Sequence, residues 1–380
     1  MKRTVFGSAV TGITILLGIG LAVAQAQGPR PPLAEDVFKN VPILRGMPVD
    51  EFMDTMGMFA AALSLNCTDC HVLDADGTWD SYAVETPLKQ TARRMVVMVN
   101  AINKTHFGGE RRVTCYTCHN GAQKPKVIPN LAVQYSSPVE DPNDMAIVAP
   151  SIPGLPSANQ IFDNYVKAVG GAQRLAGLTT FVAKGTYAGY DTDLQQVPVE
   201  LYAKAPDHRA MVVHAPYGDK VTTYDGQTAW IASADRPLPL MPLTGGNLAG
   251  ARAEAIVAFP AQIPQAFAQW RVGIATIDDR DVYVAQGTQP GRLPVSLYFD
   301  QQSNVLVRLV RWNETAVGRV PTQIDYADYR DVAGVKIPFR LITTWTNGQS
   351  TIALTDVQPN VPIDSARFAR PVAAAPPKLQ

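Results

Sequence analysis

The sequence has few cysteines, few charged residues and no excess of charge of either sign. Only four of its 380 residues are cysteine, and all four lie in two short clusters, which excludes a scaffold stapled by disulfides. Charged residues make up 17% of the chain, so it is not a disordered acidic or basic tail. The 33 basic and 33 acidic residues cancel, which gives no support for nucleic-acid binding. The length allows two domains, or one large one.

The N-terminus carries the pattern of an export signal. Lys2 and Arg3 precede an apolar run over residues 5–23, and small residues alternate through positions 22–26. This order is typical of a secretory signal peptide, and we predict cleavage after Ala26. The mature protein would then be periplasmic or lie on the periplasmic face of the inner membrane. Since the run is almost long enough to span a bilayer, an uncleaved anchor helix is the alternative.

After the predicted signal peptide, residues 1–26, the chain divides by composition into three regions and a tail. Residues 33–122 contain both cysteine clusters and show helical patterning. Residues 123–156 contain seven prolines, which predicts an extended linker because proline fixes φ and lacks an amide donor. Residues 157–370 are rich in strand patterns, and residues 371–380 are expected to form a flexible tail. The predicted fold class is multidomain: a small, mainly α domain followed by an α+β domain with a curved antiparallel sheet or half-barrel.

Helix signals recur in the first region. Pro48 opens a segment that runs to about Leu63, and Pro87 opens another that runs to about Asn103. Proline is favoured at the first position of a helix. A cysteine cluster follows each predicted helix, so this region is a degenerate internal repeat.

The third region begins with one helix and continues with strands. Residues 157–160 form a capping box, and apolar residues alternate with more polar ones in segments 199–204 and 295–300. We expect nine or ten strands. Helical insertions are predicted near residues 248–259 and near residues 263–270.

The cysteine clusters share one spacing. Each has two cysteines separated by two residues and followed at once by histidine: Cys67-Thr-Asp-Cys70-His71 and Cys115-Tyr-Thr-Cys118-His119. This is the attachment signature of c-type haem, in which two thiols bond one porphyrin edge and the histidine binds iron. A bare pair of cysteines could be a redox dithiol or half a zinc site. The histidine in both copies and the export signal favour two covalently bound haem c groups.

Each haem iron needs a sixth ligand, and methionine is a typical one in c-type cytochromes. The methionines on the two predicted helices are the candidates: Met53, Met56, Met58, Met95 and Met98. Only one per haem can be a ligand, so the others are expected to be ordinary core residues.

Four segments of this region carry a family resemblance: Val37-Phe-Lys-Asn-Val, Leu44-Arg-Gly-Met-Pro-Val-Asp-Glu-Phe, Thr91-Ala-Arg-Arg-Met and Val113-Thr-Cys-Tyr-Thr-Cys-His-Asn-Gly. Through them, residues 35–122 resemble the cytochrome c subunit of purple-bacterial photosynthetic reaction centres. The resemblance implies that a methionine on the helix before each motif is the distal iron ligand. The matching positions are Met56 and Met95, with Met53 and Met98 as the alternatives.

The resemblance covers under a quarter of the chain. The family subunit carries four haems, whereas this chain has cysteines for two and resembles only its first half. In the family, a histidine before the second motif reaches another haem. His106 occupies that place here and is a relic, a surface residue or a ligand.

Other polar residues have weaker assignments. Four arginines suit haem propionates or a solvated basic face: Arg93, Arg94, Arg111 and Arg112. His208 and His214 are expected to be surface or core residues without a ligand role.

The second domain resembles half-barrel domains related to periplasmic lipoprotein carriers. The resemblance is carried by the leading helix, the serial strands and the segment Tyr326-Ala-Asp-Tyr-Arg-Asp-Val-Ala-Gly-Val-Lys-Ile-Pro-Phe-Arg. It implies an apolar concave face able to hold an acyl chain, a quinone-like molecule or a partner segment. The alternative is a domain with a filled core.

The sequence therefore predicts an exported dihaem c-type cytochrome that carries electrons and is not an enzyme. Its partners would be a membrane redox complex, photosynthetic or respiratory, and a small soluble electron carrier. Two alternatives remain open: a dihaem peroxidase-like enzyme with one open iron, and a redox-linked module that binds lipid or a partner through the half-barrel.

Overall fold

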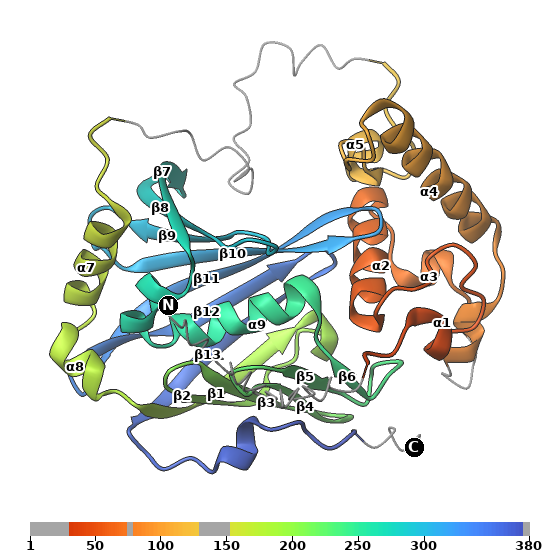
Figure 1. The fold of residues 1–380 in the computed structure, drawn as a ribbon. Helices are drawn as coiled ribbons and strands as arrows, with labels where there is room; N and C mark the ends of the chain where they lie inside the picture. Colours follow the sequence, from red (N-terminus) through yellow and green to blue (C-terminus); the bar gives the residue numbers. More distant parts are fainter. Residues whose placement is uncertain (1–29, 74–78, 129–152, 375–380) are drawn as a thin grey trace, which may run out of the picture. The chain divides into compact units, whose positions relative to one another are not determined.

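A computed structural model describes residues 30–73, 79–128 and 153–374 (Figure 1). From Pro31 onward, the described residues belong to one compact unit. The predicted signal peptide, most of the proline-rich linker and the last six residues of the tail lie outside the described residues. Within the described ranges, no helix combines the length and apolarity needed to cross a membrane.

The first region is helical, as predicted. Pro48 is the N-cap of the first long helix, and Pro87 is the first residue of the second, where the Thr86 hydroxyl accepts a hydrogen bond from Lys89 N at 3.3 Å. The second helix continues to His106, three residues beyond the predicted end, and glycine follows only at Gly108. The elements of this region are α1 (Ala34–Val37), α2 (Val49–Leu63), α3 (Cys67–Cys70), η1 (Trp79–Ala83), α4 (Pro87–His106) and α5 (Cys115–His119).

The second region is one antiparallel sheet. It has 13 strands among the described residues, in the order β6-β5-β4-β3-β2-β1-β13-β12-β11-β10-β9-β8-β7. The prediction of nine or ten was too low, partly because β5 and β6 span only four and three residues and show little alternation. The strands are β1 (Thr180–Gly189), β2 (Val197–Lys204), β3 (His208–Ala215), β4 (Gly218–Tyr224), β5 (Ala229–Ala232), β6 (Leu240–Pro242), β7 (Gln269–Ile277), β8 (Arg280–Thr288), β9 (Val295–Asp300), β10 (Leu306–Thr315), β11 (Gly318–Val332), β12 (Val335–Trp345) and β13 (Gly348–Pro359).

The α-helices of this region lie before the sheet and in one insertion, and short 3₁₀ turns lie after β1 (η3, Tyr190–Thr192) and after β13. The predicted capping box is present: Ser157 Oγ accepts from Gln160 N at 3.3 Å, and Gln160 Oε1 accepts from Ser157 N at 2.7 Å. The second predicted insertion was partly wrong, because it ends at Gln265 as a 3₁₀ turn and Trp270 already belongs to β7. These elements are α7 (Ala158–Ala168), α8 (Ala172–Gly177), α9 (Gly245–Val257), η4 (Pro260–Gln265) and η5 (Ser365–Phe368).

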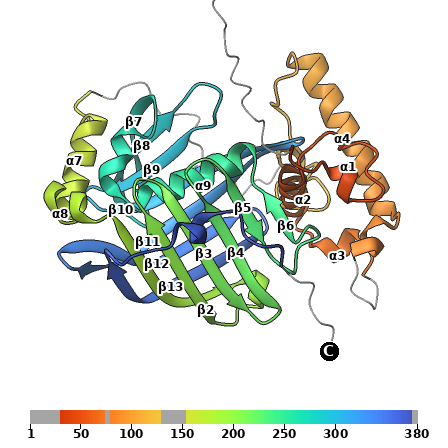
Figure 2. The same ribbon diagram turned by 60° about the horizontal axis from the view of Figure 1, so that its bottom comes forward.

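The sheet curves strongly around α9. Glu254 of α9 forms ion pairs with Arg209 of β3 at 3.5 Å and with Arg311 of β10 at 3.2 Å. These two strands are six strand spacings apart in the sheet, which would be about 29 Å if the sheet were flat. One carboxylate reaches both strands only because the sheet folds round the helix, and the arrangement can be followed in Figures 1 and 2.

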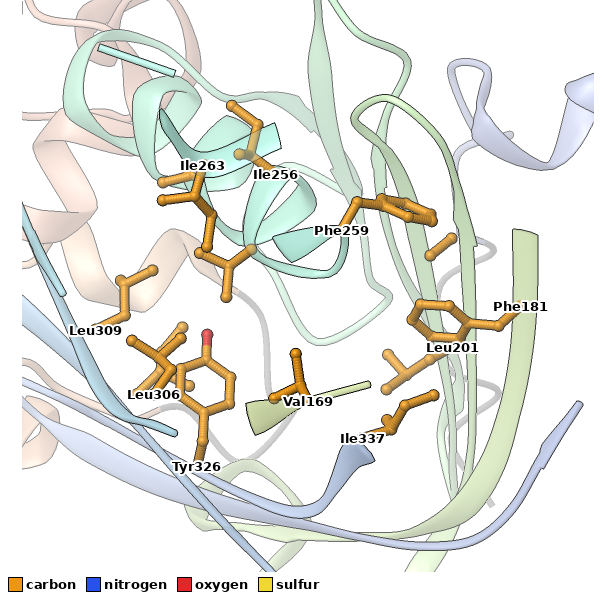
Figure 3. Packing of buried hydrophobic residues seen from close by; sticks show 14 of the residues in the cluster. Val169, Phe181, Leu201, Ile256, Phe259, Ile263, Leu306, Leu309, Tyr326 and Ile337 are labelled. Carbon is orange, nitrogen blue, oxygen red and sulfur yellow. The ribbon is translucent and has the colours of Figure 1, made fainter. Parts of the chain in front are cut away.

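The concave face is packed with side chains of the chain itself. Ile256, Phe259 and Ile263, from α9 and the segment after it, are buried in the main core. Figure 3 shows them gathered with strand residues such as Leu201 and Ile337. The described part of this face is therefore occupied.

Strand β9 is buried on both faces, which differs from the predicted alternation. Val295, Leu297 and Phe299 belong to the main core, as expected from the pattern. Tyr298, on the other face, is fully buried in a second cluster with residues such as Val284 and Val310. A tyrosine ring carries enough apolar area to be buried in this way.

Neutralising Glu254 should destabilise the sheet. Its side chain is 17% exposed, and Glu254→Gln would leave two mostly buried guanidinium groups without their ion-pair partner. We expect a loss of about 3 kcal/mol in the free energy of unfolding, measured by chemical denaturation.

Glu314→Gln is the matched control. Glu314 also bridges two arginines, Arg111 at 2.8 Å and Arg319 at 3.4 Å, but its side chain is 44% exposed. The loss there should be below about 1 kcal/mol. Equal losses of unfolding free energy in the two variants would show that the buried Glu254 ion pairs stabilise the protein no more than the exposed ones of Glu314.

Candidate haem-binding sites

The first cysteine motif lies on a short capped helix. Asn66 Oδ1 accepts from Thr68 N at 2.9 Å and from Asp69 N at 3.0 Å. Asp69 Oδ2 accepts in return from Asn66 N at 2.7 Å, which completes a reciprocal capping box. The cap holds Cys67 and Cys70 three residues apart on a single turn, so that both thiols lie on one side of it.

The second motif is built in the same way from different residues. Thr114 Oγ1 accepts from Thr117 N at 3.3 Å, and Thr117 Oγ1 accepts from Thr114 N at 3.0 Å. This cap starts the turn that carries Cys115 and Cys118. All four cysteines have free thiols, so none is consumed by a disulfide.

Both motif histidines have one ring nitrogen tied to the backbone. His71 Nδ1 lies 2.9 Å from the carbonyl oxygen of Tyr82, and His119 Nδ1 lies 3.0 Å from that of Ala122. A carbonyl oxygen can only accept, so Nδ1 carries the hydrogen and Nε2 presents its lone pair. This is the tautomer that binds a metal ion through Nε2, with the other nitrogen oriented by a backbone acceptor.

Tyr82 and Lys89 support the first histidine, and sequence reasoning did not identify either. The rings of His71 and Tyr82 stack with centroids 4.8 Å apart. Lys89 Nζ donates to the carbonyl oxygens of Tyr82 at 2.8 Å and Val84 at 2.7 Å, which fixes the loop that presents the acceptor. Burial lowers the pKa of His71, which favours its neutral form. No sequence motif predicts that this loop supports the histidine.

Apolar side chains are exposed beside both motifs. Large hydrophobic side chains of this region are exposed: Val72, Leu73, Trp79, Val84, Leu88, Val97, Met98 and Tyr116. A porphyrin is a large apolar plate and would cover such side chains where it lies against them. In the described part of the chain, no three histidine, cysteine or acidic side chains cluster as metal ligands. The free thiols, the histidine tautomers and the apolar surroundings fit covalent haem.

The candidate methionines occupy different environments. Met56 and Met95 are half-buried, as is Met53. Met58 is buried in a small core, and Met98 is exposed. Met56 and Met95 remain predictions for the distal ligands.

The candidate propionate-binding arginines are largely paired within the protein. Arg93 bonds the Glu85 carboxylate, Arg112 pairs with Glu110 at 2.8 Å, and Arg111 pairs with Glu314. Arg94 instead donates to the Thr91 hydroxyl at 2.9 Å.

The other histidines lie outside the two motifs. His106 is exposed at the last position of α4. His214 pairs with Asp219 at 2.8 Å, and His208 Nδ1 lies 3.5 Å from an Asp207 carboxylate oxygen.

A hairpin of the sheet completes the core beneath the second motif. The two-residue turn between β10 and β11, Ala316 and Val317, enters the helical region. Val317 is 2% exposed, and it is buried in one cluster with Val320 and with residues of the helical region: Leu44, Met58, Ala62, Val96 and Cys115. No motif in the sequence predicts this contact.

Gly318 shows how closely this hairpin fits. Its φ is +154°, and a Cβ there would lie 2.9 Å from Met58 Cε and 3.1 Å from Thr114 Cγ2. A side chain at this position would be strained and would also collide with the helix cap of the second motif.

Helix α2 is tied to the sheet through its acidic face. Asp50, which is buried, accepts from Thr244 N at 2.6 Å and from Thr244 Oγ1 at 2.8 Å. Asp54 accepts from Asn247 at 2.7 Å and also from Asn313, and burial raises its pKa. The helix that carries Met53 and Met56 is thereby fixed to α9 and β10.

Comparison with known families agrees with the motif reading of the first region. Residues 20–149 match the family model described as photosynthetic reaction centre cytochrome C subunit. This family carries covalently bound haem c, the group that the motif spacing predicts.

Curated relatives match the same part of the chain. The photosynthetic reaction center cytochrome c subunit of Thermochromatium tepidum is 39% identical over 111 residues, which are 28% of this chain and 25% of that protein. The subunit of Rubrivivax gelatinosus is 34% identical over 116 residues, 29% of each chain. The chain thus spans little more than a quarter of the length of the curated relatives that it matches.

Solved structures align with the sheet region at low identity. A LolA superfamily protein from Nitrosomonas europaea covers 57% of this chain and 98% of its own, at 15% identity and a TM-score of 0.39. A lipoprotein-sorting protein domain from Vibrio parahaemolyticus covers 56% and 97%, at 10% identity and a TM-score of 0.37.

Proposed function

We propose that this protein is an exported dihaem c-type cytochrome that transfers electrons between redox partners. The observation that carries the proposal is the duplicated site: a capped Cys-x-x-Cys turn followed by a histidine whose Nδ1 donates to a backbone carbonyl. A redox dithiol would not need this histidine arrangement, and the Cys-x-x-Cys-His spacing in both copies is the attachment signature of haem c.

The residues that would hold the two haems follow from this geometry. His71 and His119 would bind iron through Nε2. The thioether bonds would form at the four thiols of Cys67, Cys70, Cys115 and Cys118. Met56 and Met95 are the proposed distal ligands. Bound haem supplies a one-electron iron couple, and methionine ligation raises its reduction potential relative to histidine. The protein would hold the ligands in place and would offer apolar side chains to the rings.

The proposed partners are a membrane redox complex and a small soluble electron carrier in the periplasm. The relatives' names support a membrane complex, since they are reaction center cytochrome c subunits. Because only the first region is similar to them, the complex is either photosynthetic or respiratory. Copurification from native membranes identifies it.

Spectroscopy of the oxidised protein tests electron carriage against the peroxidase-like alternative. Two low-spin haems, each with methionine-to-iron charge-transfer absorption, support a carrier with both irons six-coordinate. A high-spin haem in the resting protein, or rapid turnover of peroxide, would contradict it. An apolar ligand in the second domain would have to displace core residues such as Phe259, and lipid analysis of the purified protein tests for it.

Removing a distal ligand should change one haem and leave both attached. In Met56→Ala and in Met95→Ala, we expect one reduction potential to fall by on the order of 0.1 V and the matching charge-transfer band to disappear. Potentiometric titration monitored by absorbance measures both effects.

Met98→Ala is the control for the second helix, since Met98 is exposed one turn along from Met95. Its potentials should match those of the unaltered protein. If a reduction potential shifts in Met98→Ala and none shifts in Met95→Ala, then Met98 rather than Met95 is the distal ligand. If neither variant moves a potential, the distal ligand is not a methionine of this helix.

A further inference from the structure

A cavity of about 740 Å³ opens beside α9, apart from both cysteine motifs. Its walls come from the first half of α9, the turn between β4 and β5, the loop between β8 and β9, the end of β10 and one residue of α2. This volume lies within the usual range of small-molecule sites. Apart from four glycines, most of the lining residues have polar or charged side chains.

Two arginines of the lining have no acidic partner. Arg252 lies on α9 and Arg292 lies in the loop between β8 and β9. Within the described ranges neither forms an ion pair, whereas Arg209 and Arg311 share Glu254 nearby. Arg252 is partly buried, so its guanidinium without a counter-charge is costly, and an anion would offset that cost. Arg292 is exposed and would bind the same anion from the loop.

Both arginines lie near one tyrosine of the cavity wall. Tyr224 lines the cavity and is buried, and burial raises its pKa to about 12. The Asp207 and Asp225 carboxylates raise that pKa further, and the charges of Arg252 and Arg292 lower it. Both guanidinium groups therefore lie within electrostatic range of one point on the cavity wall.

Gln289 adds an unsatisfied group to the same lining. Its side-chain oxygen is buried and accepts no hydrogen bond from the described residues. A buried acceptor without a donor is unfavourable, so an occupant that carries a hydroxyl or amine would be stabilised here.

The acidic residues of the lining do not cancel the arginines. Glu314 is paired with Arg111 and Arg319. Burial and the neighbouring Asp50 and Asp54 raise the pKa of Glu51, and no ion pair of 4 Å or less links Glu51 to either cavity arginine in the described structure.

We propose that this cavity binds a small molecule or lipid head group that carries a phosphate or carboxylate, with Arg252 and Arg292 as its anion-binding side chains. Guanidinium groups bind such anions through paired, charge-assisted hydrogen bonds. The site is independent of haem binding, so its test does not depend on the electron-transfer proposal.

The test uses the full holoprotein and three probes: inorganic phosphate, citrate, and vesicles of phosphatidylcholine with or without phosphatidylglycerol. Calorimetry measures binding of the first two, and cosedimentation measures binding of vesicles. We expect saturable binding of at least one probe, weakened about tenfold or more in the double variant Arg252→Gln/Arg292→Gln. Binding of phosphate or citrate indicates a free anion, whereas binding confined to phosphatidylglycerol vesicles indicates a lipid head group.

The double variant Arg271→Gln/Arg340→Gln is the control, since it removes the same charge at exposed residues outside the cavity. It should bind as the unaltered protein does. Equal weakening in both double variants, or no saturable binding of any probe, would overturn the proposal. If the first double variant unfolds, the single variants Arg292→Gln and Arg252→Gln replace it in the test. Arg292 is exposed in a loop, so Arg292→Gln should fold. Undiminished probe binding by both single variants would also overturn the proposal.

Discussion

Replacing Cys115 and Cys118 together with serine should leave the exported protein with one covalently bound haem instead of two. Serine cannot form a thioether, so the second motif would lose both covalent bonds to the porphyrin. Haem absorbance per protein chain and the intact mass of the purified protein measure the change. Two haems in this variant would show that the second motif is not an attachment site.

The matching variant of the first motif, Cys67→Ser/Cys70→Ser, should also retain one haem, but the two should differ in stability. Cys115 is 8% exposed and belongs to the small core that joins helices and hairpin, whereas Cys67 is exposed. Loss of the second haem therefore opens a packed core, and loss of the first uncovers surface residues. We expect the lower thermal midpoint for the variant of the second motif.

Placing a charge at the tip of the β10–β11 hairpin should disrupt the helical region. In Val317→Asp, a carboxylate would enter a cluster of apolar side chains that offers it no described partner. We expect a loss of about 4 kcal/mol, with the absorbance of the second haem changing at a lower denaturant concentration than in the unaltered protein. Denaturation followed at a haem wavelength and by circular dichroism separates this region from the sheet.

Tyr217→Asp is the matched control for that substitution. Tyr217 is the second residue of a two-residue turn between β3 and β4, as Val317 is between β10 and β11. Its side chain is 68% exposed, so the change should cost less than about 0.5 kcal/mol. Similar effects of the two substitutions would mean that the hairpin does not support the helical region.

The β10–β11 hairpin shows that the helical region and the sheet region share a core. The helical region takes two of the seven buried members of its own core cluster, Val317 and Val320, from the sheet. Buried bonds from Asp50 and Asp54 to α9 and β10 add a second connection. The region that carries the cysteine motifs is therefore not packed independently, although composition divides the chain there.

The local features of the fold could be read from the sequence. Pro48 and Pro87 start their helices as predicted, and the capping box at Ser157 is present. These features depend on hydrogen bonds between residues at most four positions apart, so the local sequence contains the information. The number of strands was underestimated partly because β5 and β6 are too short to show alternation. The predicted burial of β9 was wrong because this strand is buried on both faces, although its sequence alternates.

By itself, the sequence determined the attachment chemistry that we propose, because two thiols and a histidine within five residues act as one local unit. Only the tertiary structure placed Val317 under the second motif, tied Glu254 to two strands six spacings apart, and brought Arg252 and Arg292 to one cavity. These contacts join segments separated by tens to hundreds of residues, and no sequence motif identifies which residues will meet. Their positions follow from how the sheet curves and where its hairpins end, which depends on the packing of the whole chain.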